Sequence, residues 1–382
     1  MKNIVFFDLN IVGVARYPLN IANEINNVLG NEKAFFYFLY EEDPSNKLND
    51  VTKMLPHNSQ LIKIKKVEYN ELRKLFQEIN PKCLLVMAQR IPDSVLIALA
   101  NELGIQTFKF QHGLYIPFMK RKAKMFFKKI KKTYRFLLYT IVLAKTIKHP
   151  IFSVVKKYFN IFIRGARITD YSLPLSKINA NKVFVYGESW KEYHKDEFGY
   201  SKTQQIIVGY PDLINLPETK STPKIDGVGY ICQTLVEDGR MAREQMIEFI
   251  KVLAKSIGNS KLYVILHPRS DMSIYQVLKD KDNVHFVKKD FPHCSKYIGH
   301  YSSLLAKAAY LTNDILLWKF NNHNEYPQYI INFAQCITAD NKQLKEFIDS
   351  KNSTYIKNDT LENYFFYDQE NTYKKIASKL LN

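Results

Sequence analysis

The segment His267-Pro268-Arg269 holds two side chains that could act on a phosphate group. It follows the apolar run LYVIL at 262–266, so His267 is expected at the carboxyl end of a strand, where sites in parallel sheets gather. An imidazole can donate to a phosphate oxygen or assist a leaving group, and a guanidinium can clamp the same phosphate. A solvated turn at a strand end is the alternative interpretation.

Ser302 and Ser303 stand where a second phosphate-binding feature could begin. They precede the apolar residues Leu304 and Leu305, which predicts the start of a helix. Hydroxyls and unpaired backbone N–H groups at a helix start can together bind an anion. Simple capping is the alternative, but two such features in one crevice favour a shared phosphate.

The segment Gln111-His112-Gly113 follows the strand-like run TFKF at 107–110. A neutral imidazole at His112 could serve as the general base for a sugar hydroxyl. Gln111 and Gly113 would then lie on the acceptor side, and the glycine would let an acceptor or the backbone approach closely. A hydrogen-bonded structural histidine is the alternative.

A fourth segment, QTLVEDGR at 233–240, follows the first strand of the second half of the chain. Its Asp-Gly pair is a turn signal, and an acidic residue there could cap the next helix. The functional interpretation is a loop that lines the donor nucleotide, and the alternative is a plain turn. The residues assigned to donor binding in this loop are Gln233, Glu237, Asp238 and Gly239.

Several reaction classes lack their motifs. The sequence contains no GxxxxGK[ST] loop, no GxGxxG after its first strand, and no GxSxG elbow. No DxD-like pair stands out as a metal holder, and the four cysteines include no CxxC pair. We therefore expect a transferase that needs no metal or other cofactor, in a reducing compartment.

Two rounds of strand–helix alternation position these segments and predict two doubly wound parallel α/β sheets. The length of 382 residues also suits two domains. A Pro- and Thr-containing stretch at 213–226 is the predicted linker. The predicted domains are 1–212, with an insertion at 114–168, and 227–382; their sites would face a central cleft.

The net charge of +18 is concentrated in one place. The insertion holds fifteen Lys and Arg residues and no Asp or Glu, interleaved with Phe, Leu, Ile and Tyr. This pattern predicts an amphipathic helical segment lying on anionic lipids, in preference to nucleic acid. No run of about 20 uncharged apolar residues predicts a membrane-spanning helix. The predicted lipid-contacting residues are Lys120, Arg121, Lys122, Lys124, Phe126, Phe127, Lys128, Lys129, Lys131, Lys132 and Arg135.

The HPR segment and the serine pair 35 positions later resemble the HP and Ser-Ser/Thr motifs of bacterial sialyltransferases and polysialyltransferases. QTLVEDG also resembles a loop of that family. The resemblance implies a GT-B fold of two Rossmann-like domains, a CMP-sugar donor, and phosphate binding by His267, Ser302 and Ser303. The family has two acidic residues and a glycine where this chain has Gln111-His112-Gly113, and His112 resembles the histidine of HG-containing CDP-glycerol phosphotransferases.

These observations together predict a glycosyltransferase on the inner face of a bacterial cytoplasmic membrane. Its donor would be the CMP conjugate of an acidic nine-carbon sugar of the sialic, pseudaminic or legionaminic type. Its acceptor would be a lipid-linked or surface glycan of capsule or lipopolysaccharide. The alternatives are a CDP-glycerol or CDP-ribitol phosphotransferase, a CMP-Kdo or UDP-sugar transferase, and a membrane-bound scaffold without activity.

Overall fold

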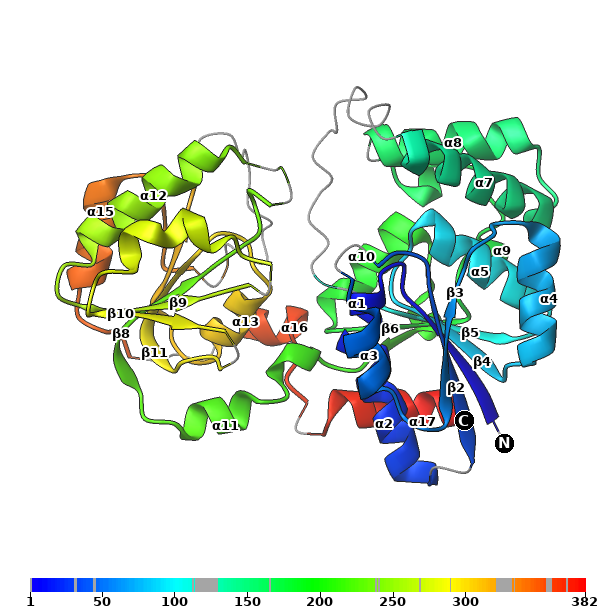
Figure 1. The fold of residues 1–382 in the computed structure, drawn as a ribbon, viewed down its shortest axis with the longest axis horizontal. Coiled ribbons are helices and arrows are strands. Elements are labelled where there is room, and N and C mark those ends of the chain that lie inside the picture. Colours follow the sequence, from blue (N-terminus) through cyan, green and yellow to red (C-terminus); the bar gives the residue numbers. More distant parts are fainter. Residues whose placement is uncertain are drawn as a thin grey trace. The chain divides into compact units, whose positions relative to one another are not determined.

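The structure is a computed structural model that describes residues 2–30, 33–43, 46–111, 113, 130–164, 166–237, 239, 241–267, 269–288, 290–320, 332, 334–354, 359–368 and 370–382. At 130–132 and 162–164 it describes the backbone alone. The chain divides into two compact units (Figure 1). The first comprises Met1–Pro211 with Asp368–Asn382, and the second comprises Asp212–Tyr367.

The first unit is built on a parallel sheet in the order β3-β2-β1-β4-β5-β6-β7. Its strands are β1 (Lys2–Phe7), β2 (Ala34–Tyr40), β3 (Ser59–Lys63), β4 (Cys83–Val86), β5 (Gln106–Phe110), β6 (Lys182–Val185) and β7 (Gln205–Ile207). Helices cover both faces of such a sheet, so its strands consist of nearly continuous apolar residues. All four residues of β4 are accordingly buried.

Helices connect these strands, as parallel pairing requires. They are α1 (Ile11–Arg16), α2 (Pro18–Leu29), α3 (Leu48–Met54), α4 (Tyr69–Ile79), α5 (Ile91–Glu102), α7 (Ile130–Ile147), α8 (Ile151–Arg164), α9 (Leu175–Ile178) and α10 (Ser189–Phe198). The helical spacing of apolar residues over 69–79, which ends before Pro81, predicts α4 with these same bounds.

The C-terminal helix α17 (Thr372–Leu381) belongs to the first unit, whereas the sequence assigned residues up to 382 to the second domain. It packs against α2 and buries Ile376 and Leu380. The ammonium groups of Lys2 and Lys82 donate to the Leu381 carbonyl, at 3.1 and 2.6 Å. These donors satisfy a carbonyl that the end of a helix leaves without an intrahelical partner, so the helix is tied to the first sheet.

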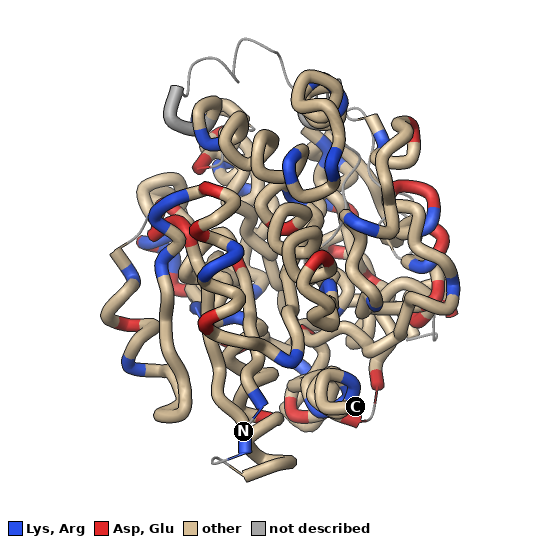
Figure 2. The backbone as a smooth tube through the Cα atoms, turned by 90° about the vertical axis from the view of Figure 1, so that its right-hand side faces the viewer, with Lys and Arg blue, Asp and Glu red and all other residues tan. Residues whose placement is uncertain are grey.

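Helices α7 and α8 fall inside the predicted basic insertion and pack as neighbours, with α7 also lying against α5. One face of α7, which includes Tyr139, Leu143 and Ile147, is buried in the first unit. Arg135 was predicted to contact lipid, but its guanidinium is ion-paired with the buried Glu41 just after β2. Figure 2 shows acidic and basic positions interspersed over the first unit.

The remaining predicted lipid contacts lie outside the described side chains. They are Lys120, Arg121, Lys122, Lys124, Phe126, Phe127, Lys128, Lys129, Lys131 and Lys132. Across the part of the chain that the structure describes, no helix combines the length and the apolar character needed to cross a membrane.

The second unit contains a parallel sheet in the order β10-β9-β8-β11-β12-β13. Its strands are β8 (Ile225–Ile231), β9 (Lys261–Ile265), β10 (Val284–Val287), β11 (Cys294–Gly299), β12 (Ile315–Trp318) and β13 (Cys336–Thr338). Its helices are α11 (Leu216–Ser221), α12 (Arg243–Ser256), the 3₁₀ helix η4 (Met272–Leu278), α13 (Leu304–Ala309), α15 (Asn341–Asp349) and α16 (Asp359–Tyr364). Helix α11 lies within the predicted linker.

Strand β11 was not predicted, although it lies between β8 and β12 in the middle of the second sheet. Its sequence CSKYIG places a lysine in a fully buried strand. The Lys296 ammonium donates to the carbonyls of Phe347 and Ile348 at 2.9 and 2.8 Å, at the end of α15. The cation is therefore satisfied by main-chain acceptors, which a local hydrophobic pattern cannot reveal.

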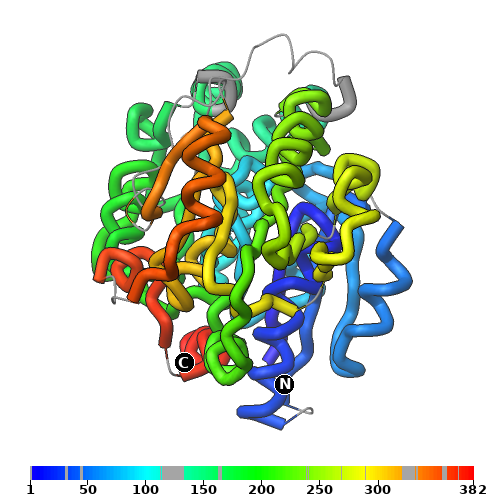
Figure 3. The backbone as a smooth tube through the Cα atoms, turned by 90° about the vertical axis from the view of Figure 1, so that its left-hand side faces the viewer, coloured from blue at the N-terminus to red at the C-terminus, as the bar shows by residue number. Residues whose placement is uncertain are grey.

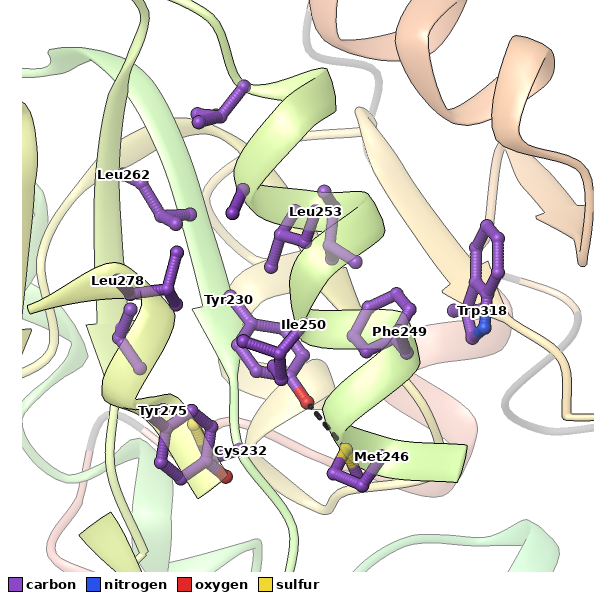
Figure 4. Packing of buried hydrophobic residues seen from close by; sticks show 14 of the residues in the cluster. Tyr230, Cys232, Met246, Phe249, Ile250, Leu253, Leu262, Tyr275, Leu278 and Trp318 are labelled. Atoms are coloured by element: carbon purple, nitrogen blue, oxygen red, sulfur yellow. Dashed lines mark hydrogen bonds between the residues drawn. The ribbon is translucent and has the colours of Figure 1, made fainter. Parts of the chain in front are cut away.

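Figure 3 shows the backbone of the second unit from its own side. An aromatic cluster fills the core between α12 and the second sheet (Figure 4). Phe249 of α12 lies 5.5 Å from Tyr230 of β8 and 5.0 Å from Trp318 of β12, measured between ring centroids. The Tyr230 hydroxyl is 3.1 Å from Nε2 of the buried His300, whose Nδ1 is 3.0 Å from the Trp318 carbonyl. Because that carbonyl can only accept, Nδ1 carries the proton that it donates to the carbonyl. The Tyr230 hydroxyl also donates to the Met246 sulfur at 3.7 Å (Figure 4).

The assignment of α17 to the first unit predicts which strands a substitution of its buried residues destabilises. We expect Leu380→Ala to cost about 2–5 kcal/mol of unfolding free energy, because it leaves a cavity against the first sheet. Hydrogen exchange should accelerate in β1 and β2 and stay unchanged in β8 and β9.

Lys379→Ala, at an exposed position of the same helix, is the control and should change stability by less than about 0.5 kcal/mol. Faster exchange in β8 and β9 alone would contradict the assignment of α17 to the first unit.

Candidate functional site

The order of the second sheet defines where a ligand would bind. Connections from β8 lead to β9 on one side, whereas the later strand β11 lies on its other side. The loops that leave β8 and β11 at their carboxyl ends therefore diverge, and this topological switch point is where ligands bind in open α/β sheets. The segments singled out from the sequence follow β8, β9 and β11.

The loop after β8 holds its two neighbouring loops through side-chain hydrogen bonds. The Gln233 side-chain oxygen accepts from the backbone N–H of Tyr301, after β11, at 3.0 Å. The buried Thr234 hydroxyl accepts from the Arg269 guanidinium, after β9, at 3.1 Å. Three loops with predicted site residues are thus brought together, and Gln233 acts by positioning Tyr301.

The turn that carries His267 and Arg269 is organised by the histidine itself. The Arg269 backbone N–H donates to His267 Nδ1 at 3.1 Å, and the Ser270 hydroxyl accepts from the His267 backbone N–H at 3.1 Å. Because a backbone N–H can only donate, Nδ1 is an acceptor, and a neutral imidazole carries its proton on Nε2. Both side chains are exposed at the carboxyl edge of the sheet.

The two serines before α13 have different surroundings. The Ser302 hydroxyl accepts from the Leu304 backbone N–H at 3.3 Å, so Ser302 performs the capping. Among the described residues, the Ser303 side chain makes no capping hydrogen bond, although Ser303 is the residue that precedes the helix. Gly299 permits the helix to lie this close, because a Cβ there would be 2.9 Å from Leu305 Cδ2.

The acidic end of the loop after β8 serves a structural purpose. One carboxylate oxygen of Glu237 accepts from the Asp271 backbone N–H at 2.7 Å, just before η4. Hydrogen bonds from Ser273 and then Arg243 lower the pKa of Asp271 to about 2. Gly239 has a φ of +67° and forms the turn, while Asp238 lies outside the described residues. Glu237 therefore positions the segment after Arg269.

In the first unit, Gln111 and Gly113 are fixed against β6 and the loop after it. The buried Gln111 side-chain oxygen accepts from the Tyr186 backbone N–H at 3.1 Å. The Gly113 backbone N–H donates to the Tyr186 hydroxyl at 3.0 Å, and its φ is +69°. A Cβ at Gly113 would meet nothing within 4 Å, so backbone conformation, and not close approach, explains the glycine. His112 lies outside the described residues.

Sequence reasoning missed an ionic cluster at the carboxyl edge of the first sheet. Arg90 bonds the buried Asp93 with two nitrogens, at 2.7 and 3.1 Å, and lies 3.6 Å from the buried Asp8 after β1. The Tyr139 hydroxyl of α7 donates to Glu41 at 2.7 Å. The sequence does place acidic residues directly after its first two strands, and this pattern could have indicated the cluster.

No group of three His, Cys, Asp or Glu side chains within the described ranges could hold a metal ion. The arrangement in the second unit instead offers an imidazole, a guanidinium and two hydroxyls at one sheet edge. These groups are donors suited to a phosphate.

Comparison with known proteins shows a shared fold. A putative UDP-N-acetylglucosamine 2-epimerase from Listeria monocytogenes matches with a TM-score of 0.55 and 10% identity, covering 100% of this chain and 96% of that one. The Neisseria meningitidis UDP-GlcNAc 2-epimerase bound to UDP-GlcNAc matches with a TM-score of 0.53 and 11% identity, covering 100% of this chain and 99% of that one. MurG from Acinetobacter baumannii matches with a TM-score of 0.50 and 9% identity, covering 100% of this chain and 99% of that one.

No protein-family model matches the sequence, and no curated protein does. At such low identity the structural likeness concerns the fold alone. It confirms the prediction of two parallel Rossmann-like sheets of the GT-B type.

The bond from Gln233 to Tyr301 predicts a local effect on the loop after β11. We expect Gln233→Leu to accelerate hydrogen exchange at the Tyr301 amide by roughly 2- to 12-fold, because a hydrogen bond contributes about 0.5–1.5 kcal/mol.

Gln233→Glu retains an accepting oxygen and is the matched control. Equal acceleration in both variants, or in neither, would show that this bond does not hold the loop.

Proposed function

We propose that the chain is a glycosyltransferase that takes a sugar from a nucleotide conjugate. The supporting observation is the pair of hydrogen bonds through which Gln233 and Thr234 join the loops after β8, β9 and β11. Arg269 and Ser302 lie on the joined loops at the switch point of the sheet, where nucleotides bind in such folds. Proteins of the same fold include enzymes named for UDP-sugar chemistry.

The proposed reaction is a transfer to an acceptor hydroxyl. His112 takes the hydroxyl proton while the oxygen forms a bond to the anomeric carbon of the sugar. The bond from that carbon to the phosphate oxygen breaks, and the nucleotide leaves with the electron pair. His267, Arg269, Ser302 and Ser303 hold the departing phosphate, whose negative charge increases as the bond breaks, so they act mainly on the transition state.

The proposed donor is the CMP conjugate of an acidic nine-carbon sugar, and the proposed acceptor is a surface glycan such as capsule or lipopolysaccharide. The resemblance of residues 267–269 and 302–303 to bacterial sialyltransferase motifs supports this donor. A UDP-sugar donor is the second candidate, because a protein of the same fold binds UDP-GlcNAc. Neither version assigns a metal ion to the reaction.

We also propose that the enzyme works at the cytoplasmic face of a bacterial membrane. The fifteen cations between residues 114 and 168, without an acidic residue, support attraction to anionic lipids. Holding the enzyme beside a lipid-linked acceptor would raise the effective concentration of that acceptor.

The donor proposal predicts selective stabilisation in a thermal-shift panel of CMP, CDP, UDP, GDP and ADP. CMP at 100 times its dissociation constant should stabilise the protein by about 2.7 kcal/mol, and His267→Ala should remove most of this effect. His285→Ala, which changes an exposed histidine on β10, is the control.

Selective stabilisation by UDP would replace the CMP donor with a UDP donor. No response to any nucleotide would remove the enzymatic proposal in favour of an inactive scaffold.

The base assignment predicts that His112→Ala lowers the rate of CMP release from CMP-sialic acid in the presence of glycan acceptors. A lost general base costs about 10²- to 10⁴-fold in rate, whereas the thermal shift with CMP should persist. The control His57→Ala changes an exposed histidine of the first unit and should leave the rate unchanged. Full turnover by the His112 variant would refute the assignment.

A further inference from the structure

The first unit contains a cavity of about 340 Å³ beside the N-terminal part of α7. Its walls come from the segment that follows β3 and from one side of α7. Glu41 directly follows the neighbouring strand β2 and pairs with Arg135 in the wall. The cavity therefore lies at the carboxyl edge of the first sheet, the edge that carries ligand sites in this class of fold. The lining residues are Lys65, Lys66, Val67, Glu68, Tyr134, Arg135 and Leu138.

The charges in the lining favour an anion. Lys65 and Lys66 are exposed at the cavity, and neither forms an ion pair within the described part of the chain. Arg135 is neutralised by Glu41, so the two lysines supply the available positive charge against Glu68 alone. Two ammonium groups on neighbouring residues are suited to a phosphate or a similar compact anion.

An exposed apolar stripe borders the same cavity. Tyr134, Leu137 and Ile141 expose 62%, 40% and 43% of their surface and follow the i, i+3, i+7 spacing of one helix face. At 100° per residue these positions span an arc of about 60°, and Leu138 in the cavity wall lies about 40° beyond it. Tyr134 belongs to both the stripe and the cavity lining, so the two surfaces meet at its ring.

We propose that this cavity and stripe together bind the anionic, lipid-linked end of the acceptor. The cavity would take the phosphate of an amphiphile, and its hydrocarbon chain would lie along Leu137 and Ile141. This inference rests on the proposed glycosyltransferase function and names the acceptor class for it. The carboxyl edge of the sheet favours a ligand of the reaction over bulk membrane lipid, and the joined polar and apolar surfaces favour an amphiphile over free phosphate.

The test is isothermal titration of the full chain with decyl phosphate, decanol and inorganic phosphate, each below its aggregation concentration. Decyl phosphate should bind at least about 10-fold tighter than either of the others, because only it uses both surfaces. The double variant Lys65→Ala with Lys66→Ala should weaken the affinity for decyl phosphate by roughly 30-fold. The double variant Leu137→Ser with Ile141→Ser should weaken that affinity by roughly 10-fold.

Two control variants test whether the losses of affinity come from this site or from a general change in charge or hydrophobicity. Lys33→Ala with Lys53→Ala removes two exposed lysines elsewhere on the same unit. Leu48→Ser removes a leucine of α3 that is 41% exposed, close to the exposure of Leu137. Neither control should change the affinity for decyl phosphate.

Equal binding of all three probes, or equal losses in the control variants, would overturn the proposal. Binding to vesicles of phosphatidylglycerol that decyl phosphate does not displace would assign the surface to bulk lipid and overturn it as well. The thermal shift with CMP, measured on each variant, checks that it folds. A retained CMP response without decyl phosphate binding would reject this site and leave the glycosyltransferase proposal standing.

Discussion

The loop after β8 is the element on which the arrangement in the second unit depends. Two of its polar side chains, Gln233 and Thr234, reach in opposite directions along the sheet edge to the loops after β11 and β9. The carboxyl ends of parallel strands lie at one edge of the sheet, but the loops that follow them diverge at the switch point. Side chains from the loop after the central strand bridge that divergence.

The two sheets share a winding order but carry different chemistry at their carboxyl edges. The edge of the first sheet holds buried carboxylates, Asp8, Glu41 and Asp93, neutralised by Arg90 and Arg135. The corresponding edge of the second sheet carries the hydrogen-bond donors of Arg269 and the serines. A buried ion-paired edge rigidifies the surrounding loops, whereas an exposed set of donors can exchange water for a phosphate. This difference supports the proposal that the donor binds to the second unit.

Helix α7 has a buried face and an exposed apolar stripe because its two sides meet different environments. Tyr139 and Leu143 face the protein and are buried, while Leu137 and Ile141 remain exposed. Arg135 marks the boundary, since its pairing with Glu41 ties the helix to the end of β2. Pairing a cation with a buried carboxylate offsets part of the cost of burying that charge. Basic composition therefore does not reveal which cations are available to a ligand.

The amino-acid sequence by itself determined the fold class and the placement of the site segments. Runs such as CLLV at 83–86 are apolar because both faces of a parallel sheet are covered, and the bounds of α4 follow from its helical periodicity. The strand-end position of His267 follows in the same way.

Only the tertiary structure decided which distant residues complete one another. Lys296 can lie in a buried strand because carbonyls at the end of α15 accept hydrogen bonds from its ammonium group. Helix α17 is tied to the first unit because Lys2 and Lys82 donate hydrogen bonds to its last carbonyl. Gln233 and Tyr301 are 68 residues apart. Local patterns record which residues are buried, but not which partner satisfies a buried polar group, since that partner is chosen by packing across the sheet.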